Sequence, residues 1–131
     1  MKYLLDTNVL IQSLISKPKL NHKALTILED DSSELYLSVV TAWEIVIKTG
    51  TGKLVLPERP AEFVARAMRF MCLQSLDITQ SHALATEDLP NYHRDPFDRM
   101  LMAQARAEGM VLLTLDRVLE KYKVEQLYCG R

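Results

Sequence analysis

Cysteine, glycine and proline are all scarce in this chain of 131 residues, which contains two cysteines, four glycines and five prolines. The cysteines, Cys72 and Cys129, show no Cys-x-x-Cys spacing and no histidines at zinc-ligand intervals, and nothing in their placement requires an oxidising compartment. We expect Cys72 to be a buried thiol and Cys129, near the end of the sequence, to be exposed. Since no linker rich in glycine, proline or serine divides the sequence, we expect a single domain over residues 1–131.

The sequence also lacks an excess of positive charge and any long hydrophobic run. Its formal net charge is −1, so no overall positive field attracts nucleic acid, and any contact with RNA must come from a local basic patch. The apolar run at residues 3–5 is followed at once by Asp6 and is too short for a signal peptide or a membrane span. We therefore expect a cytoplasmic protein without a membrane partner.

The hydrophobic pattern alternates between short apolar runs and longer amphipathic stretches. The short runs predict strands at residues 3–5, 35–38, 73–78, 110–114 and, as a short edge strand, 126–128. The longer stretches predict helices at residues 9–15, 21–29, 41–48, 60–71, 80–86, from Pro96 to near Gly109, and from about Arg117, with a loop at residues 87–95. This alternation favours an α/β fold, a three-layer α/β/α sandwich with a central, mostly parallel sheet of about five strands.

Two acidic residues come directly after predicted strands. Asp6 follows the first strand, and Asp116 follows the strand at residues 110–114 with one residue between. Ligands of open α/β sheets bind outside the carboxyl ends of the strands, so both side chains should face one crevice if these strands are neighbours. The alternative for each residue is a helix N-cap or a role in a turn.

Glu44 interrupts a predicted helix that is apolar nearly all round. Burying a carboxylate there is costly unless it is paired or binds a cation. The alternative is a surface ion pair with Lys48, four residues further on. For the neighbouring Trp43 we expect packing in the core rather than stacking on a base.

Asp98 lies in the first turn of the helix that Pro96 begins. Asp95 is a plausible N-cap of this helix, and capping accounts fully for Asp95 but only in part for Asp98. His93 is the histidine nearest to an acidic motif. It is either a solvated loop residue or a group that acts near the leaving group.

Taken together, Asp6, Glu44, Asp98 and Asp116 form a set with one chemical use, because carboxylate oxygens are the ligands that Mg²⁺ and Mn²⁺ favour. Such an ion lowers the pKa of a bound water and offsets charge on phosphoryl oxygens. The sequence shows no Ser/His/Asp or Cys/His arrangement that suggests covalent catalysis. Candidates for phosphate contacts, each with a solvated or ion-paired alternative, are Lys48, Arg94, Arg99 and Arg117. Arg99 has a further alternative, an ion pair with a carboxylate of the site.

Four segments resemble, in order, the motifs of the PIN-domain family and, more narrowly, of VapC-type toxin ribonucleases: MKYLLDTNVL at residues 1–10, SVVTAWEI at 38–45, DPFDRMLMAQA at 95–105 and LLTLD at 112–116. The resemblance implies that Asp6, Glu44, Asp98 and Asp116 are the metal ligands and catalytic carboxylates. It also implies a parallel sheet, Mg²⁺- or Mn²⁺-dependent endonucleolytic cleavage of RNA, a homodimer, and inhibition by a cognate antitoxin protein of a type II toxin–antitoxin pair. Side chains that would hold the carboxylates, or else serve local turns, are Thr7, Asn8 and Thr114.

Two other functions fit parts of the pattern. A phosphatase of the haloacid dehalogenase class also places an aspartate after its first strand, but it needs a second aspartate two residues later, where this chain has Asn8. The other alternative is a PIN-like module that binds RNA or a protein partner without cutting RNA.

Overall fold

The computed structural model describes residues 1–131, apart from the side chain of Lys17, and it is built around a five-stranded sheet. Every neighbouring pair of strands in this sheet is parallel, and the strand order is β3-β2-β1-β4-β5. The strands are β1 (Lys2–Leu5), β2 (Glu34–Ser38), β3 (Gln74–Leu76), β4 (Val111–Thr114) and β5 (Gln126–Tyr128). All five predicted strands are confirmed, with differences only at their ends.

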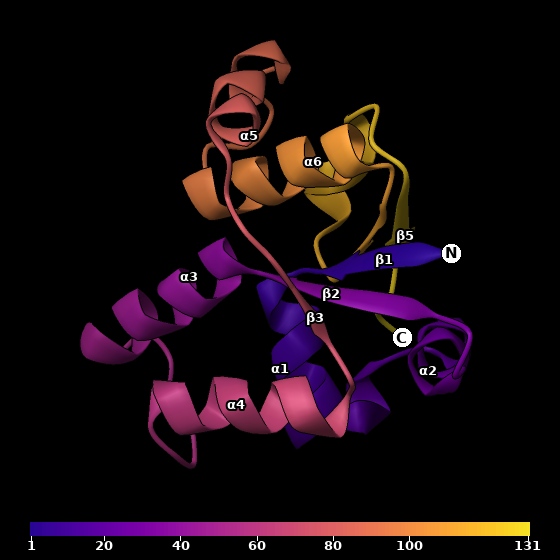
Figure 1. The fold of residues 1–131 in the computed structure, drawn as a ribbon, viewed down its shortest axis with the longest axis vertical. Helices are drawn as coiled ribbons and strands as arrows, with labels where there is room; N and C mark the ends of the chain where they lie inside the picture. Colours follow the sequence, from indigo (N-terminus) through magenta and orange to yellow (C-terminus); the bar gives the residue numbers. More distant parts are fainter.

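Helices cover both faces of the sheet, so the predicted three-layer α/β/α architecture is confirmed (Figure 1). The α-helices are α1 (Thr7–Ile15), α2 (His22–Glu29), α3 (Val39–Gly50), α4 (Pro60–Phe70), α5 (Gln80–Ala85) and α6 (Pro96–Glu108). Short 3₁₀ turns are η1 (Lys17–Lys19), η2 (Thr86–Asp88) and η3 (Arg117–Lys121). In the described part of the chain, no helix combines the length and the apolar composition that a membrane span requires.

Side chains that alternate along β1 and β4 divide the core into two halves. Leu5 and Leu113 pack in the cluster beneath α1 and α4, whereas Leu4 and Leu112 pack against α6 on the other face. All four leucines are fully buried, and each contributes about 1.5–3 kcal/mol of hydrophobic stabilisation. Since a shift of one residue would turn every side chain to the wrong face, this pattern fixes the register in which β1 and β4 pair.

The order of the strands reverses at the middle of the sheet. The chain adds β2 and β3 on one side of β1 and then returns to add β4 and β5 on the other side. In such sheets the two connections leave β1 and β4 in opposite directions, which opens a crevice at their carboxyl ends. The two strands that Asp6 and Asp116 follow are therefore neighbours, as the prediction of a shared crevice required.

Three helices differ from the prediction by two residues or more, and the first of them, α1, begins at Thr7 rather than at residue 9. The helix α3 begins at Val39, because Ser38 caps it by accepting a hydrogen bond from the Val40 N–H, and it continues through Gly50 rather than ending at residue 48. After β4, the expected helix is a single 3₁₀ turn, η3, with Asp116 as its N-cap. The N-cap alternative for Asp116 is thus present in the structure.

Both predictions for the cysteines were wrong. Cys129 is fully buried, and burial, together with the charge of Asp6, raises the pKa of its thiol to about 12. Cys72 is exposed and lies just after α4 with a positive φ of 52°. This left-handed conformation lets the Leu73 N–H donate to the carbonyl of Met68 at 3.0 Å, which closes the end of α4.

The conformation of Cys72 leads to a prediction about stability. Glycine adopts a positive φ without a steric penalty, so Cys72→Gly should raise the free energy of unfolding by about 0.5–1 kcal/mol. Cys72→Ala is the control, because it removes the thiol and keeps the Cβ, and it should leave stability unchanged. Urea denaturation followed by circular dichroism measures both changes. A glycine variant no more stable than the alanine variant would contradict the prediction.

Candidate active site

Asp6 links the ends of the two central strands. Its Oδ1 accepts a hydrogen bond from the Val9 N–H at 2.8 Å, which caps α1, and its Oδ2 accepts one from the Leu115 N–H at 3.3 Å, just beyond β4. The hydroxyl of Thr114 also donates to the Asp6 carboxylate, while its oxygen accepts from the Asp116 N–H at 3.0 Å. Asp6 is only 3% exposed. Thr114 therefore connects two of the predicted site residues.

Glu44 is buried in α3, as one alternative required, and it also pairs with Lys48, as the other alternative required. One oxygen accepts a hydrogen bond from the Thr7 hydroxyl at 2.5 Å, and the other forms an ion pair with Lys48. The pair with Lys48 exists, but Glu44 is only 4% exposed, so this is not a pair between two surface side chains. The hydroxyl of Thr41 lies 3.4 Å from that of Thr7 and extends the buried polar contacts around Glu44.

His93 joins the remaining two acids. Its Nε2 lies 2.8 Å from Oδ2 of Asp98 and 3.5 Å from Oδ2 of Asp116. One ligand atom from each of these three side chains lies within 4.8 Å of the other two, which makes the trio a possible metal-binding group among the described residues. Asp6 and Glu44 are not part of this close group. Of the two alternatives for His93, the structure does not support a freely solvated loop residue, because its ring contacts two site carboxylates.

The charges of the acids nevertheless act on one another. The pKa of Asp6 is raised to about 6, first by burial and also by the charge of Asp98. The hydrogen bonds from Thr114 and from the Val9 N–H oppose this rise. The pKa of Asp98 is likewise raised to about 6, first by burial and also by the charges of Asp95 and Glu44. The hydrogen bond from His93 opposes this rise. The structure thus brings Asp98 near enough to Asp6 and to Glu44 for their charges to interact, and His93 connects Asp98 to Asp116.

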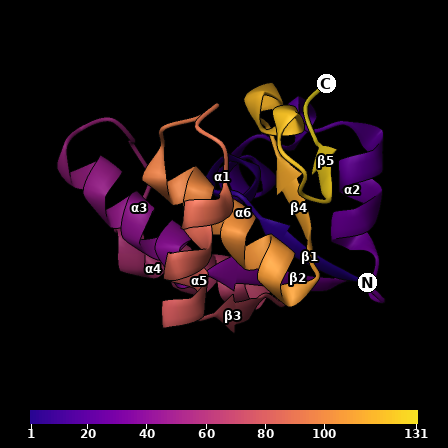
Figure 2. The same ribbon diagram turned by 90° about the horizontal axis from the view of Figure 1, so that it is seen from above.

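The elements that carry these acids meet at one end of the sheet. Asp6, Glu44 and Asp116 lie on segments that directly follow β1, β2 and β4. The first turn of α6, which carries Asp98, lies beside α3 in both ribbon views (Figures 1 and 2), and Trp43 and Phe97 contact each other there. The helix α2 lies at the opposite end of the strands (Figure 2).

Lys48 lies within this set of acids rather than apart from them. Burial would lower the pKa of its ammonium, but the hydrogen bond with Glu44 and the charges of Glu44, Asp95 and Asp98 outweigh burial and raise it. Lys48 therefore offsets part of the negative charge. Any phosphate that it contacted would compete with Glu44 for its ammonium group.

Other predicted residues lie outside the acidic set or have local roles. Asp95 accepts hydrogen bonds from the N–H groups of Phe97 and Asp98, so its prediction as an N-cap is confirmed. Asn8 is exposed, and no hydrogen bond joins its side chain to another described residue. Arg94 and Arg117 are exposed, and Arg117 pairs with Glu120.

Arg99 contacts the backbone of the preceding loop rather than a carboxylate. Its guanidinium donates to the carbonyls of Thr86, Leu89, Pro90 and His93 at 2.8–3.3 Å. The expectation that it binds phosphate or pairs with a site acid is therefore not supported. This role could not be predicted from the sequence, because every residue has a backbone carbonyl and the sequence does not indicate which of them Arg99 contacts.

A buried polar network behind α6 was also missed. Gln104 accepts a hydrogen bond from the Ser38 hydroxyl at 2.6 Å and donates to the carbonyl of Asp77 at 3.3 Å. Since Ser38 caps the helix that carries Glu44, this network fixes α3 against α6. A signal was present, because Gln104 interrupts an apolar stretch of its helix just as Glu44 does.

We predicted that Trp43 packs in the core, and this prediction was wrong. Trp43 is 58% exposed and contacts Phe97 edge-on, with ring centroids 5.5 Å apart. Val39 and Val46 are exposed on the same helix. The surface of α3 beside Glu44 is therefore apolar.

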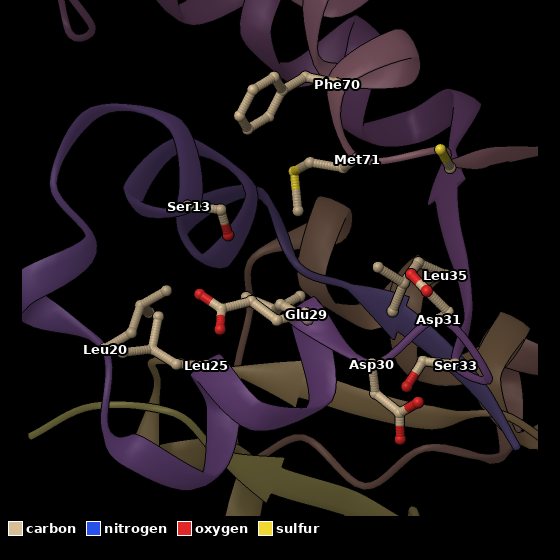
Figure 3. A pocket seen from close by; sticks show the side chains of 12 residues that line it. Ser13, Leu20, Leu25, Glu29, Asp30, Asp31, Ser33, Leu35, Phe70 and Met71 are labelled. Atoms are coloured by element: carbon tan, nitrogen blue, oxygen red, sulfur yellow. The ribbon is translucent and has the colours of Figure 1, made fainter.

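Figure 3 shows a cavity of about 440 Å³ between α2, α4 and the start of β2. Leucines including Leu20, Leu25 and Leu35 line it, together with the acidic residues Glu29, Asp30 and Asp31, and none of the four predicted site acids does. We place the candidate site at the four predicted acids rather than at this cavity, because Asp6 and Glu44 are buried there and the ligand atoms of Asp98 and Asp116 lie close to that of His93.

The raised pKa of Asp98, which comes first from burial and then from the charges of Asp95 and Glu44, predicts how the stability of the metal-free protein depends on pH. A carboxyl whose pKa is raised from 3.8 to about 6 on folding binds its proton more tightly in the folded state, so stability falls as pH rises through 4 to 6. Asp98→Asn removes this charge and still accepts a hydrogen bond from His93. In EDTA at pH 7.5 it should raise the free energy of unfolding by about 1–2 kcal/mol, and at pH 4 by much less.

Asp30→Asn is the matched control for this experiment. Asp30 is exposed, and hydrogen bonds from Ser32 lower the pKa of its carboxyl, so its substitution should give no gain in stability at pH 7.5. Chemical denaturation at the two pH values tests the pair of variants. An Asp98→Asn protein that is less stable than the unsubstituted chain at pH 7.5 would contradict a raised pKa for Asp98.

Comparison with known proteins agrees with this geometry. A family model described as the PIN domain matches residues 3–125. A search of curated protein sequences gave no match. Among solved structures, the chain is similar to VapBC2 from Rickettsia felis bound to a DNA fragment from their promoter (TM-score 0.71, 16% identity, 98% of each chain covered). It is also similar to DNA-bound VapBC from Salmonella typhimurium (TM-score 0.69, 23% identity, 98% of each chain) and to a toxin–antitoxin complex from Klebsiella pneumoniae (TM-score 0.60, 18% identity, 89% of each chain).

At these identities the solved structures establish a shared fold. The family model reaches further, because its match includes the segments that follow β1, β2 and β4 and the first turn of α6. It also favours this family over the haloacid dehalogenase phosphatases that share an aspartate after the first strand. Since the match spans nearly the whole sequence, the chain belongs to the PIN domain family.

Proposed function

We propose that this protein is a metal-dependent endoribonuclease and the toxin of a toxin–antitoxin pair. The observation that carries the proposal is the convergence of acids from four segments at the carboxyl end of the sheet, with Asp6 and Asp98 buried enough to raise their pKa values to about 6. Membership of the PIN domain family supports nuclease activity, because the matched region contains all four acids.

The chemistry of the donors fits a divalent cation. Carboxylate oxygens from Asp6, Glu44, Asp98 and Asp116 are hard ligands of the kind that Mg²⁺ and Mn²⁺ favour. Repulsion among buried carboxylates is relieved when a cation lies between them. When bound, such an ion lowers the pKa of a water molecule and offsets the charge on the phosphoryl oxygens.

The surrounding side chains and backbone orient these acids. Thr7 donates to Glu44, and Thr114 together with the Leu115 N–H donates to Asp6, so each buried carboxylate has a fixed direction. In the proposed hydrolysis, one of the carboxylates takes the proton of the attacking water and the 3′ oxygen of the RNA leaves. Lys48 and the exposed Arg94 are candidates to contact the RNA phosphates.

The proposed partner is a cognate antitoxin protein. Support comes from the similar chain in the toxin–antitoxin complex from Klebsiella pneumoniae and from the VapBC structures. We propose also that the protein forms a homodimer and acts in the cytoplasm. The exposed Val39, Trp43 and Val46 give α3 an apolar surface of the kind that protein interfaces bury.

Cleavage of RNA by the purified protein, free of antitoxin, tests the proposed activity. We expect cleavage with Mg²⁺ or Mn²⁺ and none in EDTA. Asp6→Asn keeps an oxygen that caps α1 but removes the charge, so it should slow cleavage by at least about a hundredfold. Asp30→Asn, far from the acids, should cleave at the unsubstituted rate. Protein that binds RNA but leaves it intact with every divalent metal would instead identify a non-catalytic binding module.

A further inference from the structure

His93 brings a nitrogen atom into a set of oxygen ligands. Its Nε2 faces Oδ2 of Asp98 at 2.8 Å and Oδ2 of Asp116 at 3.5 Å, and these two acids come from different elements, α6 and the start of η3. The three side chains are partly buried, at 19–34% exposure. The ring therefore points into the acidic site rather than into bulk solvent.

Two other side chains hold the loop that delivers this ring. The hydroxyl of Tyr122 accepts from the His93 N–H at 2.8 Å and donates to the carbonyl of Pro90 at 2.7 Å. Arg99 donates to the carbonyls of Pro90 and His93, at 2.8 and 3.3 Å. Tyr122 is only 4% exposed, so its hydroxyl is held by the core. Tyr122 and Arg99 thus fix the N–H and the carbonyl of His93, and with them the position from which its imidazole extends.

The spacing of the three ligand atoms suits one cation. Atoms bound to one ion at about 2.0–2.3 Å lie at most about 4–4.6 Å apart. One atom each from His93, Asp98 and Asp116 lies within 4.8 Å of the others, so a small movement brings all three to a common centre. An ion there would occupy the place of the hydrogen that Nε2 directs at the carboxylates, and the ring would bind as neutral imidazole with its hydrogen on Nδ1.

We propose that His93 Nε2 is a ligand, together with Asp98 and Asp116, of the ion in the proposed nuclease site. Mn²⁺ favours oxygen ligands too, but as a first-row transition-metal ion it accepts an imidazole nitrogen more readily than Mg²⁺, which keeps oxygen ligands and water. The histidine therefore biases this site toward Mn²⁺ over Mg²⁺, beyond what carboxylates alone provide. The inference rests on the proposed metal-dependent function.

Pulsed electron paramagnetic resonance of Mn²⁺ bound to the whole protein tests this directly. We expect hyperfine coupling to a ¹⁴N nucleus, changing to the ¹⁵N pattern when the histidines are labelled with ¹⁵N. His93→Ala should lose the coupling, and His22→Ala, which changes an exposed histidine at the start of α2, should retain it. By calorimetry, His93→Ala should weaken Mn²⁺ binding about tenfold and Mg²⁺ binding less than about threefold.

The outcomes separate this inference from the proposed function. If Mn²⁺ binds without nitrogen coupling, and Asp98→Asn abolishes this binding, then His93 is not a ligand but the proposed carboxylate site is retained. An unsubstituted protein that binds no Mn²⁺ overturns both. Labelled, unsubstituted protein gives the decisive spectrum even if His93→Ala does not fold.

Discussion

Burial of carboxylates, with repulsion between neighbouring ones added to it, is the constraint on which this site depends. Asp6, Glu44 and Asp98 come from three elements; burial raises the pKa values of Asp6 and Asp98, and the charge of Asp98 on Asp6 and that of Glu44 on Asp98 add to this effect. Hydrophobic packing on both faces of the sheet supplies the free energy that holds them there, because the strands that lead to the acids carry the fully buried leucines. The buried acids therefore lower the free energy of unfolding, and the packing of the two halves of the core offsets this loss. A bound cation would reduce it.

Hydrogen bonds fix the orientation of the buried carboxylate groups of Asp6 and Glu44 as well as their positions. Asp6 caps α1 while it accepts from the segment beyond β4, so one side chain fixes the ends of both central strands. Glu44 has Thr7 on one oxygen and Lys48 on the other. The network of Ser38 and Gln104 fixes the helix of Glu44 to the helix of Asp98. Because these contacts join different elements, a substitution at one of them is expected to disturb the geometry of acids that it does not touch.

The sequence predicted the acids better than it predicted their surroundings. Asp6 and Asp116 were found because residues after neighbouring parallel strands meet at one edge, and Glu44 because it interrupts an apolar helix. The orientation of Trp43 was missed, since a helix that is apolar nearly all round gives no sign of which face is exposed. The contact of His93 with the acids depends on Tyr122, 29 residues away, and on backbone carbonyls, and neither leaves a periodic pattern. Cys72 takes a conformation that glycine usually adopts, and without a glycine at this position it could not be predicted.

The most direct test of a shared acidic site is a crystal structure of the protein grown with Mn²⁺, with data collected at a wavelength where manganese scatters anomalously. We expect an anomalous difference peak bounded by Asp98 and Asp116 and facing Asp6. Ordered side chains in these positions, with manganese found elsewhere or not at all, would contradict a shared acidic metal site.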